Sequence, residues 1–257
     1  MSSSASDRGC ESMIIYFSAT GNCKYVAKRI SEAIGDAVLS MLECAEKNQY
    51  EFKDSVIGII SPTYDYTLPV ITRDFLSKAK LDAEYLFYVS TYGTSPGGTG
   101  IHAAKQLGKD FSAYFSVRMA DTWTPTYDLS TPEKVKEFTR TTEQEIDSVI
   151  AHVKKREHGQ FMEHKAPAVL ATIGKLLYEN TRKTNHLYVE DACIGCGLCA
   201  KKCPVQAIEM QNKKPVWVKD RCVMCLGCLH RCPKFAIQYG NGKTKEHGQY
   251  TNPHVKV

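Results

Sequence analysis

A cysteine motif occurs twice near the end of the sequence, and it constrains the fold more than any other feature. Both copies have the spacing CxxCxxCxxxCP, the first over residues 193–204 and the second over residues 222–233. The similarity extends beyond the cysteines, because residues 193–208 (CIGCGLCAKKCPVQAI) align without gaps with residues 222–237 (CVMCLGCLHRCPKFAI). Eight of the eleven cysteines lie in these two copies. An internal duplication therefore generates this part of the chain.

The spacing within each copy indicates an iron–sulfur cluster. Three thiolates two residues apart can bind three irons of one [4Fe-4S] cubane if the backbone curls tightly, and Gly195, Gly197 and Gly227 permit such a curl. Zinc modules usually place a longer stretch between two CxxC pairs. Disulfides are disfavoured because no secretory signal accompanies the cysteines. Each copy is thus predicted to bind a cluster, with a fourth ligand from elsewhere in the chain.

Residues 186–239 resemble the two-cluster bacterial ferredoxins, which form a small α+β domain. In that pattern the fourth cysteine of each copy binds the cluster of the other copy. The resemblance therefore implies two [4Fe-4S] clusters with crossed ligation. One cluster would be held by Cys193, Cys196, Cys199 and Cys232, and the other by Cys222, Cys225, Cys228 and Cys203.

The length and composition indicate a two-domain globular protein. The chain has 257 residues, of which 43% are hydrophobic, enough for two cores. No apolar run approaches the length of a membrane span, and residues 1–12 are small and polar, so we expect a disordered lead and no signal peptide. Together with oxygen-sensitive clusters, these features predict a cytoplasmic protein from an anaerobic or strongly reducing setting, with no membrane partner.

The positive charge is concentrated in the cysteine-rich part. The formal net charge is +5, and residues 184–257 carry 11 Lys and Arg against 5 Asp and Glu. Nucleic-acid binding is not expected, because no binding motif accompanies the charge and thiolate-ligated clusters are themselves anionic. We interpret the excess as a solvated surface or a docking face for an acidic redox partner.

Near the other end of the sequence, a strand, a short turn and a helix follow one another. Residues 13–17 (MIIYF) read as a strand, residues 18–24 (SATGNCK) as the turn, and the helix ends at Gly35. This arrangement presents backbone N–H groups and the positive end of a helix to an anion, typically a phosphate. The turn is similar to the phosphate loop of flavodoxins, [ST]xTGxT, which binds the phosphate of FMN. The matching residues are Ser18, Thr20, Gly21 and Asn22.

Two residues of this turn have open interpretations. Cys23 stands where flavodoxins usually have a hydroxyl, and a thiol at a helix N-terminus can be reactive; a small packing residue beneath the phosphate is the favoured interpretation. Lys24 either adds charge to the phosphate site or points to solvent.

Two further loops follow predicted strands at residues 55–60 and 85–90, after a second strand at 37–42. The first loop, residues 61–69, is rich in Pro and Tyr, and the second, residues 91–100, has four glycines. Helices are expected at 69–78 and 99–107. Flavodoxins place their two flavin loops at these positions. The resemblance implies FMN contacts from Cys23, Pro62, Thr63, Tyr64, Tyr66, Thr91, Tyr92, Gly93, Gly97 and Gly98.

The first 158 residues therefore predict an α/β fold. A fifth strand at 112–119 is followed by a loop at 121–127, and Thr131 caps a long helix to residue 155. Strands that alternate with helices form a parallel sheet, and we expect the flavodoxin-like five-stranded order 2-1-3-4-5 with its ligand at the switch between strands one and three. Residues 13–158 are assigned to this FMN-binding domain.

The remaining segments are assigned as a helical linker (159–185), the ferredoxin domain (186–240) and a tail of polar coil (241–257). An amphipathic helix at 168–179 is expected to pack in the domain interface. Residues 188–189 are expected to pair with 216–217 as strands, as are the regions around Ile208 and Ile237. The apolar residues of the helix are Val169, Leu170, Ile173, Leu176 and Leu177.

The combination resembles the flavodoxin–ferredoxin fusion proteins of anaerobes. Clusters carry one electron each and FMN carries one or two, so the fusion joins single-electron to two-electron chemistry. Two functions stay open: an electron carrier that serves a redox partner protein, favoured on family analogy, and a reductase in which the clusters feed the flavin for reduction of a small organic substrate. Nothing in the sequence indicates the oligomeric state, and no GxGxxG turn for NAD(P)H is present.

A reductase needs a proton donor beside the flavin. Tyr64 and Tyr66 are the catalytic candidates for that case, and Asp65, His102 and Arg118 are further polar candidates.

Overall fold

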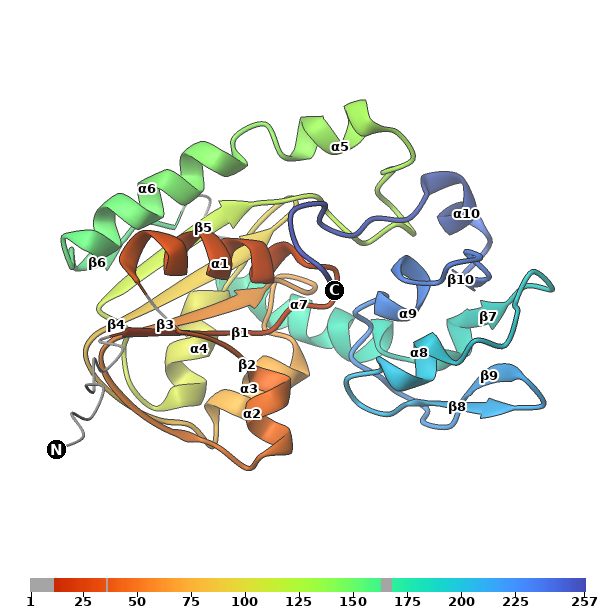
Figure 1. The fold of residues 1–257 in the computed structure, drawn as a ribbon, viewed down its shortest axis with the longest axis horizontal. Coiled ribbons are helices and arrows are strands. Elements are labelled where there is room, and N and C mark those ends of the chain that lie inside the picture. The colour runs from red at the N-terminus through yellow and green to blue at the C-terminus, as the bar shows by residue number, and fades with distance from the viewer. Residues whose placement is uncertain (1–11, 36, 163–167) are drawn as a thin grey trace, which may run out of the picture.

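A parallel sheet of six strands forms the larger part of the molecule, and two antiparallel strand pairs lie in the smaller part (Figure 1). The computed structural model describes residues 12–35, 37–162 and 168–257. The six strands have the order β2-β1-β3-β4-β5-β6, which confirms the predicted order 2-1-3-4-5 and adds one edge strand. The strands are β1 (Ser12–Tyr16), β2 (Ala37–Ser40), β3 (Glu51–Pro62), β4 (Lys80–Tyr92), β5 (Ala113–Arg118) and β6 (Gly159–Gln160).

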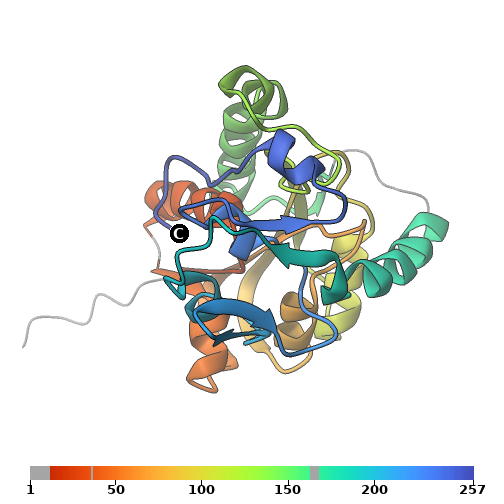
Figure 2. The same cartoon turned by 90° about the vertical axis from the view of Figure 1, so that its right-hand side faces the viewer.

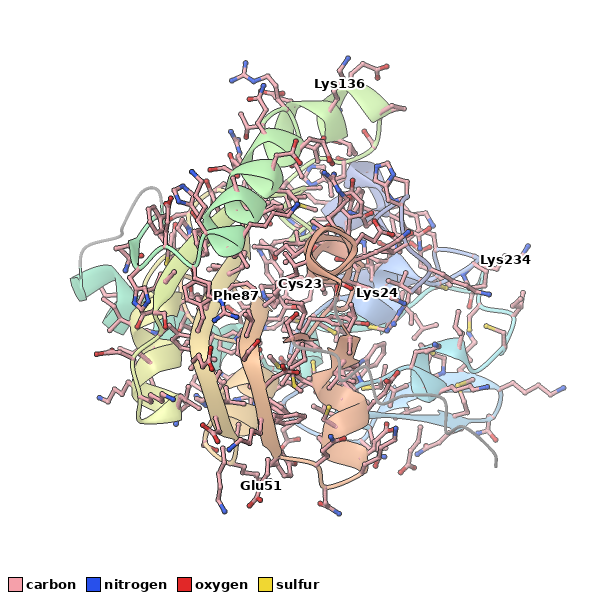
Figure 3. The ribbon with its side chains drawn as sticks, turned by 60° about the vertical axis from the view of Figure 1, so that its left-hand side comes forward. Cys23, Lys24, Glu51, Phe87, Lys136 and Lys234 are labelled. Atoms are coloured by element: carbon pink, nitrogen blue, oxygen red, sulfur yellow. The ribbon has the colours of Figure 1, made fainter. Side chains whose placement is uncertain are left out.

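Helices cover both faces of this sheet. One face packs against α1 (Asn22–Ile34) and α6 (Thr142–Lys154), and the other packs against α2 (Met41–Glu46), α3 (Val70–Leu76) and α4 (Thr99–Leu107). Successive strand residues point to opposite faces, so Phe87 packs on the α1 side and Tyr88 on the α3 side. Figure 3 shows Phe87 within the sheet and Glu51 at the edge where β3 begins.

Two predicted elements of this part have different bounds. The second strand ends at Ser40 instead of residue 42, because the Ser40 hydroxyl accepts a hydrogen bond from Leu42 N (3.3 Å) and begins α2. The long helix to residue 155 is broken into α5 (Pro132–Phe138) and α6. At the break, Thr139 Oγ1 donates to Val135 O (3.1 Å), and Thr142 Oγ1 donates to Arg118 O at the end of β5.

The smaller part begins with α7 (Ala168–Thr181) and a short 3-10 turn, η1 (Thr184–His186). Strand β7 pairs with β10 and β8 pairs with β9, so the predicted pairings of 188–189 with 216–217 and of Ile208 with Ile237 are wrong. The β8–β9 hairpin forms because Asn212 and Lys213 both adopt positive φ (49° and 62°), as a two-residue hairpin turn requires. These elements are β7 (Leu187–Val189), α8 (Leu198–Lys201), β8 (Ile208–Gln211), β9 (Lys214–Trp217), α9 (Gly227–His230), β10 (Ile237–Tyr239) and α10 (Lys243–His247).

Helix α7 packs against the rest of the molecule through a face other than the predicted one. Tyr178 is only 1% exposed, whereas the predicted interface residues Ile173, Leu176 and Leu177 are 44%, 70% and 50% exposed. A Cβ added at Gly174 would lie 2.2 Å from the Asp65 carbonyl oxygen, so the helix approaches this loop at its glycine. The side chains of Val169 and Leu170 lie outside the described residues. None of the described helices is long and apolar enough to cross a membrane.

The segment predicted as a tail of polar coil is structured and crosses the molecule. After α10 the chain runs back towards the parallel sheet and ends beside α1 (Figure 1). Seen from the smaller part, this returning chain and the β8–β9 hairpin lie in front of the sheet (Figure 2). Residues 249–257 are called the C-terminal strap below. Tyr250 and Asn252 in the strap are 7% and 3% exposed, which is unlike a solvated coil.

Candidate cofactor sites

The eight motif cysteines surround two cavities in the smaller part of the molecule. One cavity is lined by Cys203, Cys222, Cys225 and Cys228, called the inner set, and has an empty volume of about 380 Å³. The other is lined by Cys193, Cys196, Cys199 and Cys232, called the outer set, and has an empty volume of about 350 Å³. Each set contains three cysteines of one copy and the fourth cysteine of the other copy, the division that crossed ligation requires.

The remaining walls of both cavities are mainly apolar, which suits a sulfur-rich cluster. The residues present thus fit a cluster in each cavity.

The tight curl of the two cysteine loops has different origins in the two copies. In the first copy, Gly195 and Gly197 have φ of 69° and 72°, as their predicted role requires. In the second copy the equivalent positions are Met224 and Leu226, which hold φ of 53° and 50° without a glycine. Gly227, which was predicted to permit this curl, is not among the residues with positive φ. Left-handed backbone at non-glycine residues costs about 1 kcal/mol or more each and commonly marks a functional site.

A polar cavity lies at the carboxyl ends of the central strands and is called the phosphate cavity. Its empty volume is about 420 Å³, and Ser18, Thr20, Asn22 and Cys23 of the predicted phosphate loop line it. Gly21, which precedes α1 with φ of 100°, donates its N–H to Ser18 Oγ (3.1 Å). Pro62, Thr63, Tyr64, Thr91, Tyr92 and Gly93 of the two predicted flavin loops line the same cavity.

The structure answers the two open questions about the phosphate loop. Cys23 is 1% exposed, and its Sγ lies 3.1 Å from Thr91 Oγ1. Burial raises the pKa of this thiol to about 12, so it stays protonated and acts as a packing residue. Lys24 Nζ donates to Lys256 O in the C-terminal strap (2.7 Å). Figure 3 shows both residues at the start of α1.

A larger cavity adjoins the phosphate cavity and lies between the two parts of the molecule; it is called the interface cavity. Its empty volume, which includes space open to solvent, is about 730 Å³. Thr63, Tyr64, Gly93, Asp121 and Thr122 line both cavities, so the two spaces lie next to each other along the strand ends. Its other walls come from both parts of the chain and include Asp65, Tyr66, Trp123, Tyr127, Tyr178, Thr181, Met224, Cys225 and Leu226.

The first flavin loop makes a strained turn at the cavity wall. Tyr64 and Thr67 exchange two backbone hydrogen bonds (3.0 and 2.9 Å), and Asp65 and Tyr66 between them have φ of 45° and 64°. Gly98 N donates to Tyr66 O (3.0 Å). A Cβ at Gly97 would lie 2.2 Å from the same oxygen. Gly97 and Gly98, predicted as FMN contacts, therefore support the turn from behind and are not part of either cavity wall.

Two carboxyl groups, Asp65 and Asp121, face the interface cavity. The pKa of Asp121 is raised to about 6, mainly by burial and to a smaller extent by the charge of Asp65, while a hydrogen bond from Trp123 N (3.1 Å) opposes the shift. Burial also raises the pKa of Asp65. The sequence analysis placed Asp121 in the loop after the fifth strand but did not identify it as a candidate site residue. Its position at the end of that strand is the sequence feature that could have identified it.

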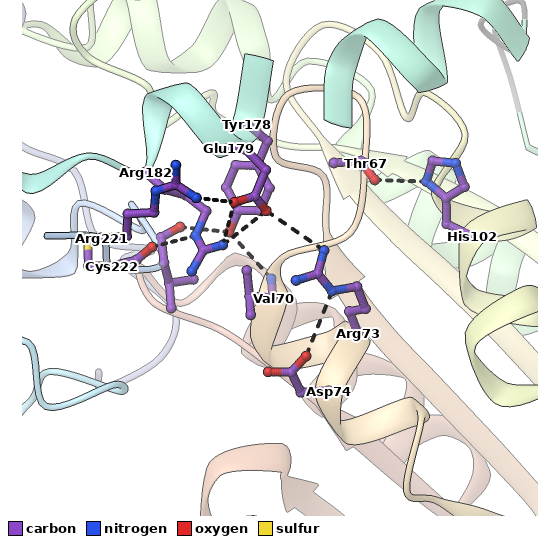
Figure 4. A network of polar contacts seen from close by, with 11 residues as sticks. Thr67, Val70, Arg73, Asp74, His102, Tyr178, Glu179, Arg182, Arg221 and Cys222 are labelled. Carbon is purple, nitrogen blue, oxygen red and sulfur yellow. Dashed lines mark hydrogen bonds and ion pairs between the residues drawn. The ribbon is translucent and has the colours of Figure 1, made fainter. Parts of the chain in front are cut away.

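The other polar candidates hold the loops in place. His102 Nδ1 lies 2.8 Å from Thr67 Oγ1 (Figure 4), and Arg118 Nε donates to Gly93 O (3.2 Å). Neither residue lines the interface cavity. Both contact the predicted flavin loops, His102 at Thr67 and Arg118 at Gly93.

Helix α7 ties the inner cysteine set to the parallel-sheet part. Tyr178 Oη donates to Val223 O (2.8 Å), and Arg182 Nε donates to Cys222 O (2.8 Å). Glu179 forms ion pairs with Arg182 (3.0 Å), with Arg221 (3.2 Å) and, more weakly, with Arg73 of α3 (3.9 Å), as Figure 4 shows. No pattern in the sequence indicated these contacts, because they depend on how the two parts dock.

Comparisons with known proteins agree with this arrangement. A family model described as a flavodoxin domain matches residues 13–148, and one described as a 4Fe-4S dicluster domain matches residues 186–233. No curated protein matches the chain.

Solved structures that match part of the chain include a flavodoxin from the domain Archaea, with 18% identity, coverage of 55% of this chain and 99% of that one, and a TM-score of 0.33. A flavoprotein in complex with FMN from Lactobacillus acidophilus NCFM has 14% identity, coverage of 42% and 92%, and a TM-score of 0.30. Rubredoxin oxygen:oxidoreductase from the anaerobe Desulfovibrio gigas has 12% identity, covers 55% of this chain, and has a TM-score of 0.33. The match spans only 36% of that oxidoreductase.

The flavodoxin-domain model covers more than half of the residues, and the dicluster model covers both cysteine motifs. The chain therefore belongs to the flavodoxin family, and its flavodoxin domain is fused to a 4Fe-4S dicluster domain, as in the flavodoxin–ferredoxin fusion proteins. It is an electron-transfer flavo-iron–sulfur protein.

Proposed function

We propose that this protein carries electrons between two [4Fe-4S] clusters and one FMN within a single chain and exchanges them with a redox partner protein. One observation carries the proposal: Cys225 lines both the inner-set cavity and the interface cavity. The clusters would supply single-electron exchange and FMN would supply one- or two-electron exchange.

The two cysteine sets differ in exposure, and this difference indicates which set would meet an external partner. Cys196 of the outer set is exposed, whereas the inner set lies against the parallel-sheet part and is anchored by α7. The outer set would therefore be the contact point for an external redox partner. The inner set would serve the flavin.

The residues around these two adjoining cavities suit FMN. The first turn of α1 and the hydroxyls of Ser18 and Thr20 would hold its phosphate in the phosphate cavity. Tyr64 and Trp123 would cover its ring in the interface cavity. The buried side chains of Met224 and Leu226 (5% and 3% exposed) keep water out of the space between the inner set and the flavin.

The test is the anaerobic reduction of the FMN-loaded protein by a reduced bacterial ferredoxin, followed at the flavin absorbance. Cys203→Ser removes the inner-set ligand that comes from the first copy, so the iron content should fall from about eight to about four per chain. Flavin reduction should slow by roughly 100-fold or more while FMN binding is retained. Flavin reduction at the wild-type rate in this variant would rule out the proposed path.

A reductase role is the second candidate, and the carboxyls of the interface cavity favour it. A group such as Asp121, with a pKa of about 6, can give a proton at neutral pH, and Tyr64 and Tyr66 add two hydroxyls to the same wall. Multiple turnovers with one small molecule would support this role. In that case Tyr64→Phe or Tyr66→Phe should lower turnover by roughly 100-fold, whereas a carrier should tolerate either change.

A further inference from the structure

The C-terminal strap contacts the predicted phosphate loop through main-chain and side-chain hydrogen bonds. Asn252 N donates to Thr20 O (2.7 Å), and the Asn252 amide donates to Asn22 Oδ1 (3.3 Å). Tyr250 Oη donates to the same Oδ1 (3.2 Å). Tyr250, Asn252 and Asn22 are all less than 10% exposed, so water does not compete well for these bonds.

With these contacts, both polar atoms of the Asn22 side chain bond to the protein. Its Nδ2 donates to Ala120 O (3.1 Å) after β5, while its Oδ1 accepts from the two strap residues. Asn22 is the first residue of α1 and lines the phosphate cavity. Its amide therefore fixes the position of the first turn of α1, whose backbone N–H groups would face the phosphate.

The strap also packs over the outer side of this turn. A Cβ at Gly21 would lie 2.9 Å from Asn252 Cβ and 3.0 Å from Val255 Cγ2, so the glycine is in close contact with the strap. The His254 ring stacks on Tyr25 of α1 with the ring centroids 4.7 Å apart. No strap residue lines the phosphate cavity, so the strap backs the loop without filling the site.

The beginning of the strap is bound to the cysteine-rich part. Gln249 Nε2 donates to Leu229 O (2.6 Å) and to Cys232 O (2.9 Å). His230 Nδ1 accepts from Tyr250 N (3.2 Å), which leaves its Nε2–H to donate to Thr122 O in the interface cavity wall (2.8 Å). The strap thus joins α9 and the outer cysteine set to the phosphate loop.

We propose that Tyr250 and Asn252 of the C-terminal strap are positioning residues for the phosphate site, which they fasten to the cysteine-rich part of the chain. The proposal rests on the FMN site of the proposed function. It assigns the strap an effect on the phosphate end of the flavin and none on the ring. The strap contacts Thr20, Gly21 and Asn22, whereas no hydrogen bond or ring contact among the described residues joins it to the first flavin loop.

The test compares FMN with riboflavin, which has the same ring and no phosphate. Both flavins are titrated anaerobically into flavin-free, cluster-loaded protein, and binding is read from the quenching of flavin fluorescence. The double variant Tyr250→Phe/Asn252→Ala leaves Asn22 Oδ1 without its two donors. We expect its dissociation constant for FMN to rise about tenfold or more, since each buried hydrogen bond accounts for a few-fold change. The constant for riboflavin should change less than about twofold.

Two further proteins complete the experiment. Lys256→Ala is the matched control within the strap: Lys24 bonds the main-chain carbonyl of Lys256, so this variant should bind FMN as wild type does. Tyr250→Phe alone is the conservative variant, and an unchanged iron content checks that each variant is folded.

The possible results separate the explanations. A selective loss of FMN affinity supports the proposal. Equal losses for FMN and riboflavin, or no loss in folded variants, overturn it and leave the strap a purely structural segment. Wild-type protein that binds FMN no tighter than riboflavin overturns the phosphate site itself and, with it, this proposal.

Discussion

Met224 and Leu226 illustrate what single residues do at the boundary between the two cofactor cavities. They occupy the backbone positions that Gly195 and Gly197 occupy in the first copy, and they adopt the same left-handed conformation. Glycine would relieve the strain but would leave no side chain between the inner cysteine set and the interface cavity. Of the two copies, only the second lines the interface cavity, and it has side chains at the turn positions where the first copy has glycines.

Asp121 should control how the flavin potential depends on pH. Above a pH of about 6 its carboxylate is ionised and disfavours negative charge on the reduced flavin, whereas below that pH it is neutral. Asp121→Asn should therefore raise the flavin midpoint potential by roughly 30 to 60 mV at pH 8. The same change should have little effect at pH 5. Anaerobic spectroelectrochemistry at the two pH values measures both shifts.

The sign of that pH dependence is the critical part of the prediction. A raised pKa means that the folded protein holds the proton more strongly than an exposed carboxyl does, so the carboxylate charge that acts on the flavin is present only once the pH exceeds about 6. Equal shifts at pH 5 and pH 8 would show that another group sets the potential.

At the scale of elements, the parallel sheet and its loops were predictable from the sequence. Each predicted strand is a short apolar run that ends at a turn, and strands of this kind carry their loops to a common edge. Local signals also placed the phosphate loop and the positions of Tyr64 and Gly93. Local signals predicted the wrong buried face of α7, where Tyr178 and Gly174 are buried and the more apolar residues are exposed. Burial of this face depends on a hydrogen bond from Tyr178 to Val223 and on the close approach of Gly174 to Asp65. The prediction of a polar coil for the strap was wrong for a similar reason, since its polar residues bond to residues that are far away in the sequence.

The Glu179 network should stabilise the docking of α7 between the two parts. Glu179→Gln keeps the shape but leaves Arg182 and Arg221 without their counter-charge. The Glu179 side chain is 30% exposed, so we expect a loss of about 1 to 2 kcal/mol and an apparent Tm lower by roughly 2 to 6 °C. Thermal unfolding of the cluster-loaded protein at low and high salt measures the effect.

An exposed ion pair provides the control for Glu179. Glu84 pairs with Arg156 at 2.8 Å, but its side chain is 73% exposed, so Glu84→Gln should change the stability by less than about 0.5 kcal/mol. Similar losses in the two variants would mean that the position of Glu179 between the two parts has no special importance.

At the scale of the whole molecule, several segments that are far apart in the sequence connect the two parts. Helix α7 lies on one side, His230 bonds the interface cavity wall at Thr122, and the strap returns to α1. The cysteine cavities and the proposed FMN site therefore share supporting residues. Loss of one cofactor should change the affinity for the other.

Removal of iron should weaken FMN binding. Helix α9 contains Cys228 and ends two residues before Cys232, and clusters of this kind hold their loops in place. Without iron, the carbonyls that bind Gln249 should shift and loosen the strap. FMN titration of chelator-treated protein should give an affinity at least a few-fold below that of reconstituted protein, with recovery after iron and sulfide are restored. An unchanged affinity would mean that α9 keeps its position without the clusters.

The wall that contains Cys225 has a kinetic consequence. Because one chain forms both sides of that wall, electron exchange between the inner cysteine set and the proposed flavin site needs no encounter between molecules. It also needs no reorientation of one part against the other. Its rate should be first order and independent of protein concentration, so dilution would slow only delivery from outside.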